Sequence, residues 1–320
     1  MKLWCSVLVS AIVLVSFAAA APFDDIAAHR VVIVDASTHK LECLDWPGAG
    51  RPIVMLAGLG STGHIFDGLA ARLSQKHRVV ALTRRGIGAS EAPSGEFDQV
   101  ALLEDIRVAL DHFSLGQVVL VAHSFGCTEA SLFAQAYPER VSAVIYLDGA
   151  YRPSASRRQL LGSVGPLMPS PSPGDAASLT SLLAWMEKFR PGWNPACESD
   201  LRSQLVVEGE TFRPRADPGL MGMMMRIAQS TEPRYEAVRC PSFAIFADNR
   251  VLGMSAALPD ERVSEKTALR AFASFVDNAN AEFDRTVALG KSTLLADTDH
   301  FCFIHREALV TELILEFIAE

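Results

Sequence analysis

Short apolar runs rich in β-branched residues recur along the chain, with longer amphipathic stretches between them. These runs predict strands at eight places: 31–35, 41–45, 53–57, 78–82, 118–122, 143–147, 242–247 and 292–296. The later runs are almost continuously hydrophobic, which is typical of parallel strands covered on both faces. The first two are expected to form an antiparallel start to the sheet.

Helical patterns separate these strands. Residues 98–114, 265–287 and 306–319 each repeat apolar side chains at steps of three and four, so that one face of a helix is apolar. Strands that alternate with helices favour a parallel sheet with helices on both faces. The sequence therefore predicts an α/β fold, a doubly wound and mostly parallel sheet of eight strands.

One region interrupts the alternation. Residues 152–238 contain no run that predicts a strand, and their first part is rich in Pro, Ser and Gly. The helical patterns within the region cover 179–189, 199–208 and 220–229. We interpret the region as a helical cap inserted into a core formed by residues 21–151 and 239–320.

The first 20 residues have the pattern of a signal peptide. Lys2 precedes an apolar stretch from Leu8 to Phe17, and Ala18 to Ala20 offer a small-residue cleavage site. The apolar stretch is short for a membrane span, which needs about 20 residues. We expect a secreted or periplasmic protein with no stable membrane anchor after cleavage.

The composition limits the classes of molecule that the protein is expected to bind. The net charge of −8 and the lack of a basic run argue against nucleic-acid binding and leave a small molecule as the expected partner. Five cysteines follow the signal peptide, and no two have the spacing of metal ligands: Cys43, Cys127, Cys197, Cys240 and Cys302. No metal or cofactor is expected, and disulfide pairing and oligomeric state stay open.

The segment with the clearest chemistry is the end of the run 118–122. It leads through His123 to Ser124, with Ala122 two residues before the serine and Gly126 two residues after it. This is the pattern of a nucleophile elbow, in which a tight strand-to-helix turn projects the serine hydroxyl. Small flanking residues are needed because the strand and helix backbones come close together. We predict Ser124 as the nucleophile.

A serine nucleophile needs an oxyanion hole and a base. The run 53–57 leads into Gly58-Leu59-Gly60, where glycines let the loop turn its amides inward. In hydrolases with this elbow, the other donor is the amide that follows the nucleophile. Leu59 and Phe125 are therefore the predicted oxyanion donors.

His300 is the predicted base, since it follows the last strand and precedes the final helix. The remaining histidines are less suitably placed: His29, His39, His64, His77, His112, His123 and His305. His123 is adjacent to Ser124, but a neighbouring side chain points the wrong way to act as its base.

Together these segments resemble the α/β-hydrolase fold family. The matching pieces are Ala57–Thr62, Thr83–Ser90, the elbow, Tyr137–Val141, Tyr146–Ala150 and the His300 segment. They cover the predicted core and leave the cap unmatched. The chain departs from the family pattern at Ala57, at Ala122 and at Arg250, which occupies the usual place of the triad acid.

The resemblance implies an acid between Ser124 and His300 in chain order. Asp148 follows the strand next to the nucleophile strand, a second known location for this acid in related enzymes. Asp248 lies near the usual location but two residues early. We predict Asp148, with Asp248 as the alternative.

These residues predict a serine hydrolase of carboxylic esters that works through an acyl-enzyme. Alternatives on the same triad are hydrolysis of amides, lactones or carbon–carbon bonds, and perhydrolysis. A non-catalytic ligand-binding protein on a hydrolase scaffold is the alternative from another class. Met223 and Met224, in a methionine cluster of the cap, are candidates for an apolar substrate-binding wall, and packing within the cap is their other interpretation.

Overall fold

The computed structural model describes most of the chain outside its first residues. The described ranges are 29–92, 95, 97–152, 171–189, 192–248 and 265–320. The predicted signal peptide and Arg250 lie outside them.

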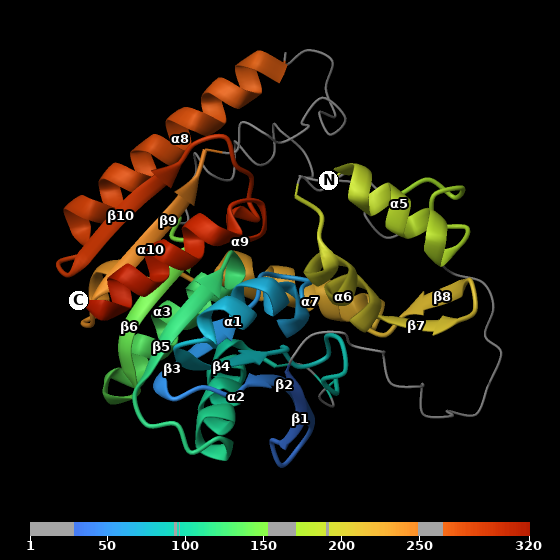
Figure 1. Cartoon of the computed structure of the whole chain (residues 1–320), viewed down its shortest axis with the longest axis horizontal. Helices are drawn as coiled ribbons and strands as arrows, with labels where there is room; N and C mark the ends of the chain where they lie inside the picture. Colours follow the sequence, from blue (N-terminus) through green and yellow to red (C-terminus); the bar gives the residue numbers. More distant parts are fainter. Residues whose placement is uncertain (1–28, 93–94, 96, 153–170, 190–191, 249–264) are drawn as a thin grey trace.

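A single eight-stranded sheet forms the centre of the molecule (Figure 1). In spatial order its strands are β1 (Arg30–Asp35), β2 (Lys40–Trp46), β4 (His77–Leu82), β3 (Gly50–Leu56), β5 (Val118–His123), β6 (Val141–Leu147), β9 (Ser242–Ala247) and β10 (Gly290–Leu295). β1, β2 and β4 pair antiparallel, and every pair from β4 to β10 is parallel. Each predicted run coincides with one of these strands, so the prediction of a mostly parallel sheet with an antiparallel start is confirmed.

Helices cover both faces of the sheet because successive strand residues point to opposite sides. Leu120 packs in the cluster with α2 (Gln99–His112), α3 (Phe125–Ala136) and α8 (Glu265–Thr286). Val121, the next residue, packs in the cluster on the other face. The elements on that face are η1 (Gly63–Phe66), α1 (Asp67–Leu73), α9 (Cys302–His305) and α10 (Glu307–Ala319). The predicted doubly wound arrangement is therefore present.

The inserted region forms a lobe beside the sheet, drawn mainly in yellow in Figure 1. Its described elements are α5 (Leu179–Phe189), α6 (Pro195–Ser203), β7 (Leu205–Glu208), β8 (Thr211–Pro214) and α7 (Pro218–Ser230). The short helical turn η3 (Tyr235–Ala237) follows α7, and a second one, η2 (Pro138–Arg140), lies in the core between α3 and β6.

The prediction of a purely helical cap was wrong in one segment. The helix expected over 199–208 ends at Ser203, and β7 pairs with β8 as an antiparallel hairpin. Val206 and Val207 are β-branched and favour a strand. Gly209 has φ of 64°, a turn conformation that glycine adopts without strain. Two β-branched residues and a turn glycine are only a weak sequence indication of a hairpin.

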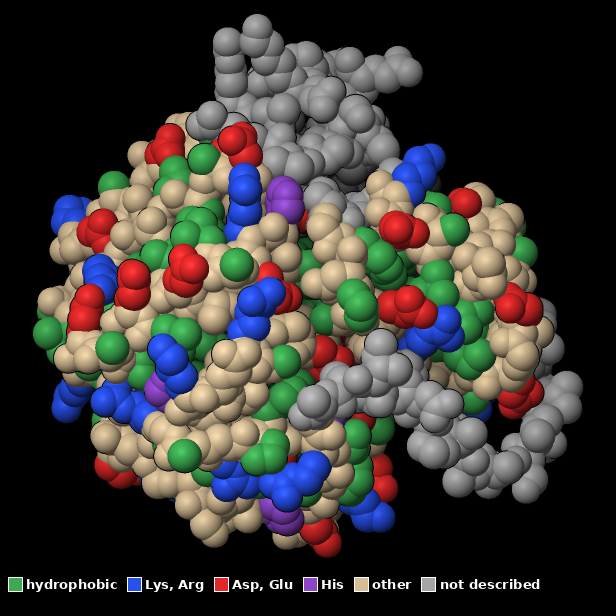
Figure 2. Space-filling model, in the orientation of Figure 1, with side chains coloured by type: hydrophobic (Ala, Val, Ile, Leu, Met, Phe, Trp, Pro, Cys, Tyr) green, Lys and Arg blue, Asp and Glu red, His purple; other side chains and the backbone are tan. Residues whose placement is uncertain are grey.

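The surface agrees with the acidic but mixed composition. Figure 2 shows acidic and basic side chains interspersed over the face in view. Among the described residues, no helix combines the length and apolar character that crossing a membrane requires.

Candidate active site

Ser124 lies on a strained turn between β5 and α3. Its φ of 53° and ψ of −118° place it in a region that residues with a side chain rarely occupy. A Cβ at Gly126 would approach the carbonyl oxygen of Leu56 to 2.3 Å, so only glycine fits there. This is the strand-to-helix turn that the elbow pattern predicts.

The loop after β3 lies directly against this serine. A Cβ at Gly58 would come within 2.9 Å of His123 Nδ1 and 3.1 Å of Ser124 Cβ, so glycine allows the close approach. The following residue is Leu59, and Phe125 is the first residue of α3, where a helix leaves its amide without an intrahelical partner. The structure thus brings both predicted oxyanion segments to the serine, while their role as donors stays a prediction.

A buried arginine braces this loop, and sequence reasoning missed it. Arg84 donates from Nη2 to the carbonyl of Ala57 at 2.8 Å and from Nη1 to that of Gly58 at 3.2 Å. The same guanidinium makes a bidentate pair with Glu129 of α3, at 2.8 and 2.5 Å, and lies 5.1 Å from the centre of the Phe125 ring. One side chain therefore holds the loop that carries Leu59 against the helix that begins at Phe125.

His300 and Asp148 meet at the carboxyl ends of the strands. His300 Nδ1 lies 2.7 Å from Asp148 Oδ2. Asp148 follows β6 with φ of 45°, and its Oδ1 accepts hydrogen bonds from the Ala247 amide at 2.9 Å and from the Tyr151 hydroxyl. These three contacts hold the carboxylate in a fixed position beside the imidazole. Tyr151 is a second residue that the sequence analysis did not identify.

The alternative acid, Asp248, has other hydrogen-bond partners than Asp148. Its two carboxylate oxygens accept from the amides of Asp297 and Thr298, at 3.1 and 3.4 Å, in the loop that leads to His300. These bonds shape the loop that carries the imidazole. The geometry therefore places Asp148 at the position of the triad acid, and its catalytic role stays a prediction.

His123 supports the same loop from the sheet side. Its Nε2 lies 2.9 Å from the carbonyl oxygen of His300, and the two rings are 4.5 Å apart. The side chain is buried and directed away from solvent, as the sequence predicts for a residue beside the elbow. Among the described residues, Ser124 Oγ and His300 Nε2 are not joined by a hydrogen bond, and such bonds often tighten only in the substrate complex.

The cap reaches the site through α6 and α7. Asp200 of α6 accepts at Oδ1 from the amide of Thr62 at 2.7 Å and from its hydroxyl at 2.9 Å, just beyond the oxyanion loop. Met224 of α7 is fully buried in a cluster with Phe125, whereas Met223 is only partly buried and packs against that cluster, as Leu59 does. Of the two predicted substrate contacts, Met223 therefore has the accessible position.

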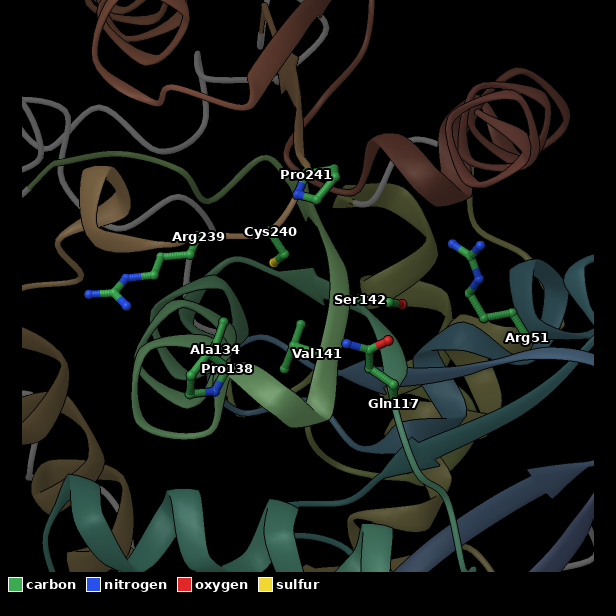
Figure 3. Close-up of a pocket in the computed structure, with 9 residues that line it drawn as sticks. All are labelled: Arg51, Gln117, Ala134, Pro138, Val141, Ser142, Arg239, Cys240 and Pro241. Atoms are coloured by element: carbon green, nitrogen blue, oxygen red, sulfur yellow. The ribbon is translucent and has the colours of Figure 1, made fainter.

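A cavity of about 470 Å³ lies at the other end of the sheet. Figure 3 shows Arg51 and Arg239 on opposite sides of it. Gln117, Val141 and Ser142 line its middle, at the amino ends of β5 and β6. Ligands of open α/β sheets bind at the carboxyl ends of the strands, so this cavity is not the candidate active site.

The cysteines near the site are deeply buried. The five described cysteines are all free thiols. Burial raises the pKa of Cys127, which follows the elbow, and of Cys302, which follows His300, well above the ordinary value. Because the thiolate is the reactive form, neither competes with Ser124 as a nucleophile.

Comparison with known proteins agrees with this fold. A family model described as the α/β-hydrolase fold matches residues 51–185. The chain is 29% identical over 101 residues to 2-(acetamidomethylene)succinate hydrolase from Mesorhizobium japonicum, and 31% identical over 113 residues to a putative carbamate hydrolase, RutD, from Cronobacter turicensis. These matches cover 32% and 34% of this chain and 36% and 42% of the relatives, so well under half of each relative is matched.

The structural similarity extends much further. The crystal structure of E-2-(acetamidomethylene)succinate hydrolase superposes with a TM-score of 0.68, covering 91% of this chain and all of that one at 19% identity. At that identity the likeness shows the fold alone. The family model covers less than half of the chain, so together with the structural likeness it shows the α/β-hydrolase fold and a similarity to proteins of that family.

Proposed function

We propose that the protein is an exported serine hydrolase that cleaves carboxylic esters of small apolar or mixed substrates through an acyl-enzyme. The observation that carries the proposal is the 2.7 Å contact between His300 Nδ1 and Asp148 Oδ2 at the strand end beside the strained Ser124. Nucleophile, base and acid are the three parts that acyl transfer requires.

The first half of the reaction forms the acyl-enzyme. Ser124 Oγ attacks the ester carbonyl while His300 Nε2 takes the hydroxyl proton, and Asp148 stabilises the imidazolium through Nδ1–H. The amides of Leu59 and Phe125 bind the oxyanion of the tetrahedral intermediate. Collapse of the intermediate breaks the carbon–oxygen bond, and His300 returns its proton to the leaving alcohol.

The second half releases the acid. Water attacks the acyl-enzyme, His300 accepts a proton from that water, and a second tetrahedral intermediate forms at the same oxyanion position. Its collapse expels Ser124, which recovers the proton from His300. No group other than water and the substrate is consumed.

Amide hydrolysis is the second candidate. A hydrolase of 2-(acetamidomethylene)succinate is among both the sequence relatives and the similar structures. The same triad serves amides, for which His300 would protonate a leaving nitrogen. Comparing kcat/KM for matched acyl esters and acyl amides decides between the two.

Export rests on the sequence of residues 1–20. Expression of the whole chain with its leader should yield a mature protein outside the cytoplasm whose first residue is Ala21. N-terminal sequencing tests this directly. An unprocessed chain in the cytoplasm would remove export from the proposal and leave the chemistry untouched.

A fluorophosphonate probe tests the chemistry. Wild-type protein should be labelled once per chain, at Ser124, and p-nitrophenyl esters of increasing chain length should reveal the acyl preference. Ser124→Ala should keep the fold and lose the label. Ser131→Ala is a matched control, because Ser131 lies in α3, and its hydroxyl donates to the Cys127 carbonyl, away from the site. Full labelling of Ser124→Ala would refute the assignment.

A further inference from the structure

A second group of histidines and carboxylates lies behind the oxyanion loop, apart from the catalytic candidates. His29 directly precedes β1, His64 lies in η1, and Asp67 is the first residue of α1. Glu42 of β2 lies next to them. Their side chains are almost entirely buried, with exposed fractions of 1% for His29, 2% for His64, 8% for Asp67 and 5% for Glu42.

The separations within this group are longer than hydrogen bonds. His29 Nδ1 lies 3.5 Å from Asp67 Oδ1, and His64 Nδ1 lies 3.7 Å from Asp67 Oδ2. Other histidine–carboxylate pairs of the same molecule are closer. His39 Nε2 and Asp105 Oδ1, for example, are 3.0 Å apart. The carboxylate of Asp67 thus faces two imidazole nitrogens across gaps that exceed the usual range of about 2.7–3.2 Å.

These gaps match the coordination shell of a metal ion. The ligand atoms of His29, His64 and Asp67 all lie within 4.8 Å of one another. A tetrahedral zinc ion with bonds of about 2.0–2.1 Å keeps its ligand atoms roughly 3.4 Å apart. Small side-chain movements would therefore bring the three atoms to bonding distance around one ion.

Glu42 occupies the position of an outer partner. His64 faces Asp67 with Nδ1 and Glu42 with Nε2, whose distance to Glu42 Oε1 is 3.6 Å. Metal-binding histidines usually direct the second ring nitrogen to a carboxylate, which fixes the tautomer and the ring orientation. On the other side, the edge of the His29 ring packs against the buried Trp46 ring at 4.7 Å, which shields the group from water.

We propose that His29, His64 and Asp67 form a zinc site, with Glu42 orienting His64. Two imidazoles and a carboxylate suit zinc, because calcium and magnesium prefer oxygen ligands alone. The charge also fits, since a divalent cation offsets the two buried carboxylates. The site would tie the chain before β1 to η1 and α1, immediately after the oxyanion loop. Its role would be structural, and it does not depend on the function proposed for Ser124.

The test uses the full chain, freed of metal with a chelator and then titrated with zinc chloride. Calorimetry should show one zinc ion per chain, and a hundredfold excess over Kd should raise Tm by about 5 °C. Cobalt(II) in the same site should give the intense visible bands of tetrahedral coordination. Diffraction at the zinc absorption edge should place the ion between His29, His64 and Asp67.

Variants assign the binding to these side chains. His29→Gln and His64→Gln should each weaken zinc binding at least tenfold, and Glu42→Gln should weaken it about 10- to 100-fold through the outer shell. His112→Gln is the control, because His112 is an exposed residue in the last turn of α2. Should a variant not fold, the cobalt spectrum and the diffraction of the wild-type chain still decide. No stoichiometric binding by the wild-type chain, or unchanged binding by both histidine variants, would overturn the proposal.

Discussion

Two histidine–carboxylate groups of this molecule use the same residue types in different ways. At the strand ends, His300 and Asp148 are 2.7 Å apart, and the His300 side chain is 23% exposed. Behind the oxyanion loop, His29 and His64 stand 3.5 and 3.7 Å from Asp67 and are almost fully buried. A close pair with one open ring nitrogen suits proton transfer. A wider, enclosed group suits an ion.

The difference shows that separation and access, more than residue identity, determine the chemistry of such a group. The difference also predicts which property of the protein each substitution should change. Changes in the open pair should appear in turnover with stability preserved, and changes in the buried group should appear in stability and metal content.

The largest expected effect is that of His300→Ala. Without its base the enzyme should lose turnover by about 10⁴- to 10⁶-fold, since the members of a triad act as a unit. The Tm should change little, because the His300 ring is partly exposed. The contrasting variant is His64→Ala, which should lower Tm while the folded protein keeps a fluorophosphonate-reactive serine. Near-normal esterase activity in His300→Ala would move the base elsewhere.

Asp148→Asn should follow, with a loss of about 10⁴-fold in kcat, because the amide cannot hold the imidazole in the required tautomer. Asp248→Asn is the matched comparison. Its carboxylate oxygens accept from the loop amides of Asp297 and Thr298, so we expect a loss of tenfold or less. Esterase kinetics on both variants decide the acid, and the reverse order of effects would give the role to Asp248.

Arg84→Lys should have an intermediate effect. Lysine keeps the positive charge near Glu129 but cannot also bind the carbonyls of Ala57 and Gly58, so the oxyanion loop should shift. A displacement of about 1 Å at this point costs up to roughly 10²-fold in kcat. The control is Arg85→Lys, since Arg85 is equally buried but pairs with Asp105 and the Ala101 carbonyl, away from the loop. Equal losses in both variants would make Arg84 a purely structural residue.

Met223→Ala should change selectivity more than rate. Shortening this partly buried side chain, which packs against the same cluster as Leu59, should alter the ratio of kcat/KM between long and short acyl esters by roughly tenfold. Met225→Ala is the control on the same helix, because Met225 is largely exposed. The zinc affinity of the buried group should not respond to either variant. An unchanged ester profile in Met223→Ala would leave the cluster a packing role only.

The smallest effect concerns the buried and half-buried thiols. Burial raises the pKa of Cys43, next to Glu42, and raises that of Cys240 to about 11. A raised pKa keeps the thiol protonated at neutral pH, so the reactive thiolate fraction increases as pH rises toward that value. Iodoacetamide should spare the native enzyme near pH 7 and modify mainly the half-buried Cys240 as pH increases. Mass spectrometry counts the modified thiols, and rapid alkylation of Cys127 at pH 7 would contradict the burial argument.

The strands and the site segments were predictable because local patterns encode them. Continuous apolar runs placed every strand of the sheet, and the small residues around Ser124 marked the elbow. Asp148 could be proposed from its position after β6, although Asp248 had a similar sequence context. The choice between them depends on which carboxylate faces His300, and that geometry is set by the loop between β10 and α9.

Other features have no local signature. Arg84 and Glu129 are 45 residues apart, and no sequence pattern around either residue predicts that the two pair beside the oxyanion loop. The group of His29, His64, Asp67 and Glu42 likewise comes from three separate elements and the segment before β1, and it lacks the spacing of a metal motif. The hairpin β7–β8 was missed for another reason, since its strands are short and follow a helix without a break.

The bond between Thr62 and Asp200 has a consequence for how such enzymes diversify. Because a carboxylate of the inserted lobe satisfies the amide and hydroxyl of a core residue, the lobe is not an independent module. A chimera that received a foreign lobe would leave two polar groups of Thr62 without their acceptor, at the base of the oxyanion loop. Recombination or design of new specificities in this scaffold therefore has to transfer an acceptor at position 200 together with the lobe, or replace Thr62 at the same time.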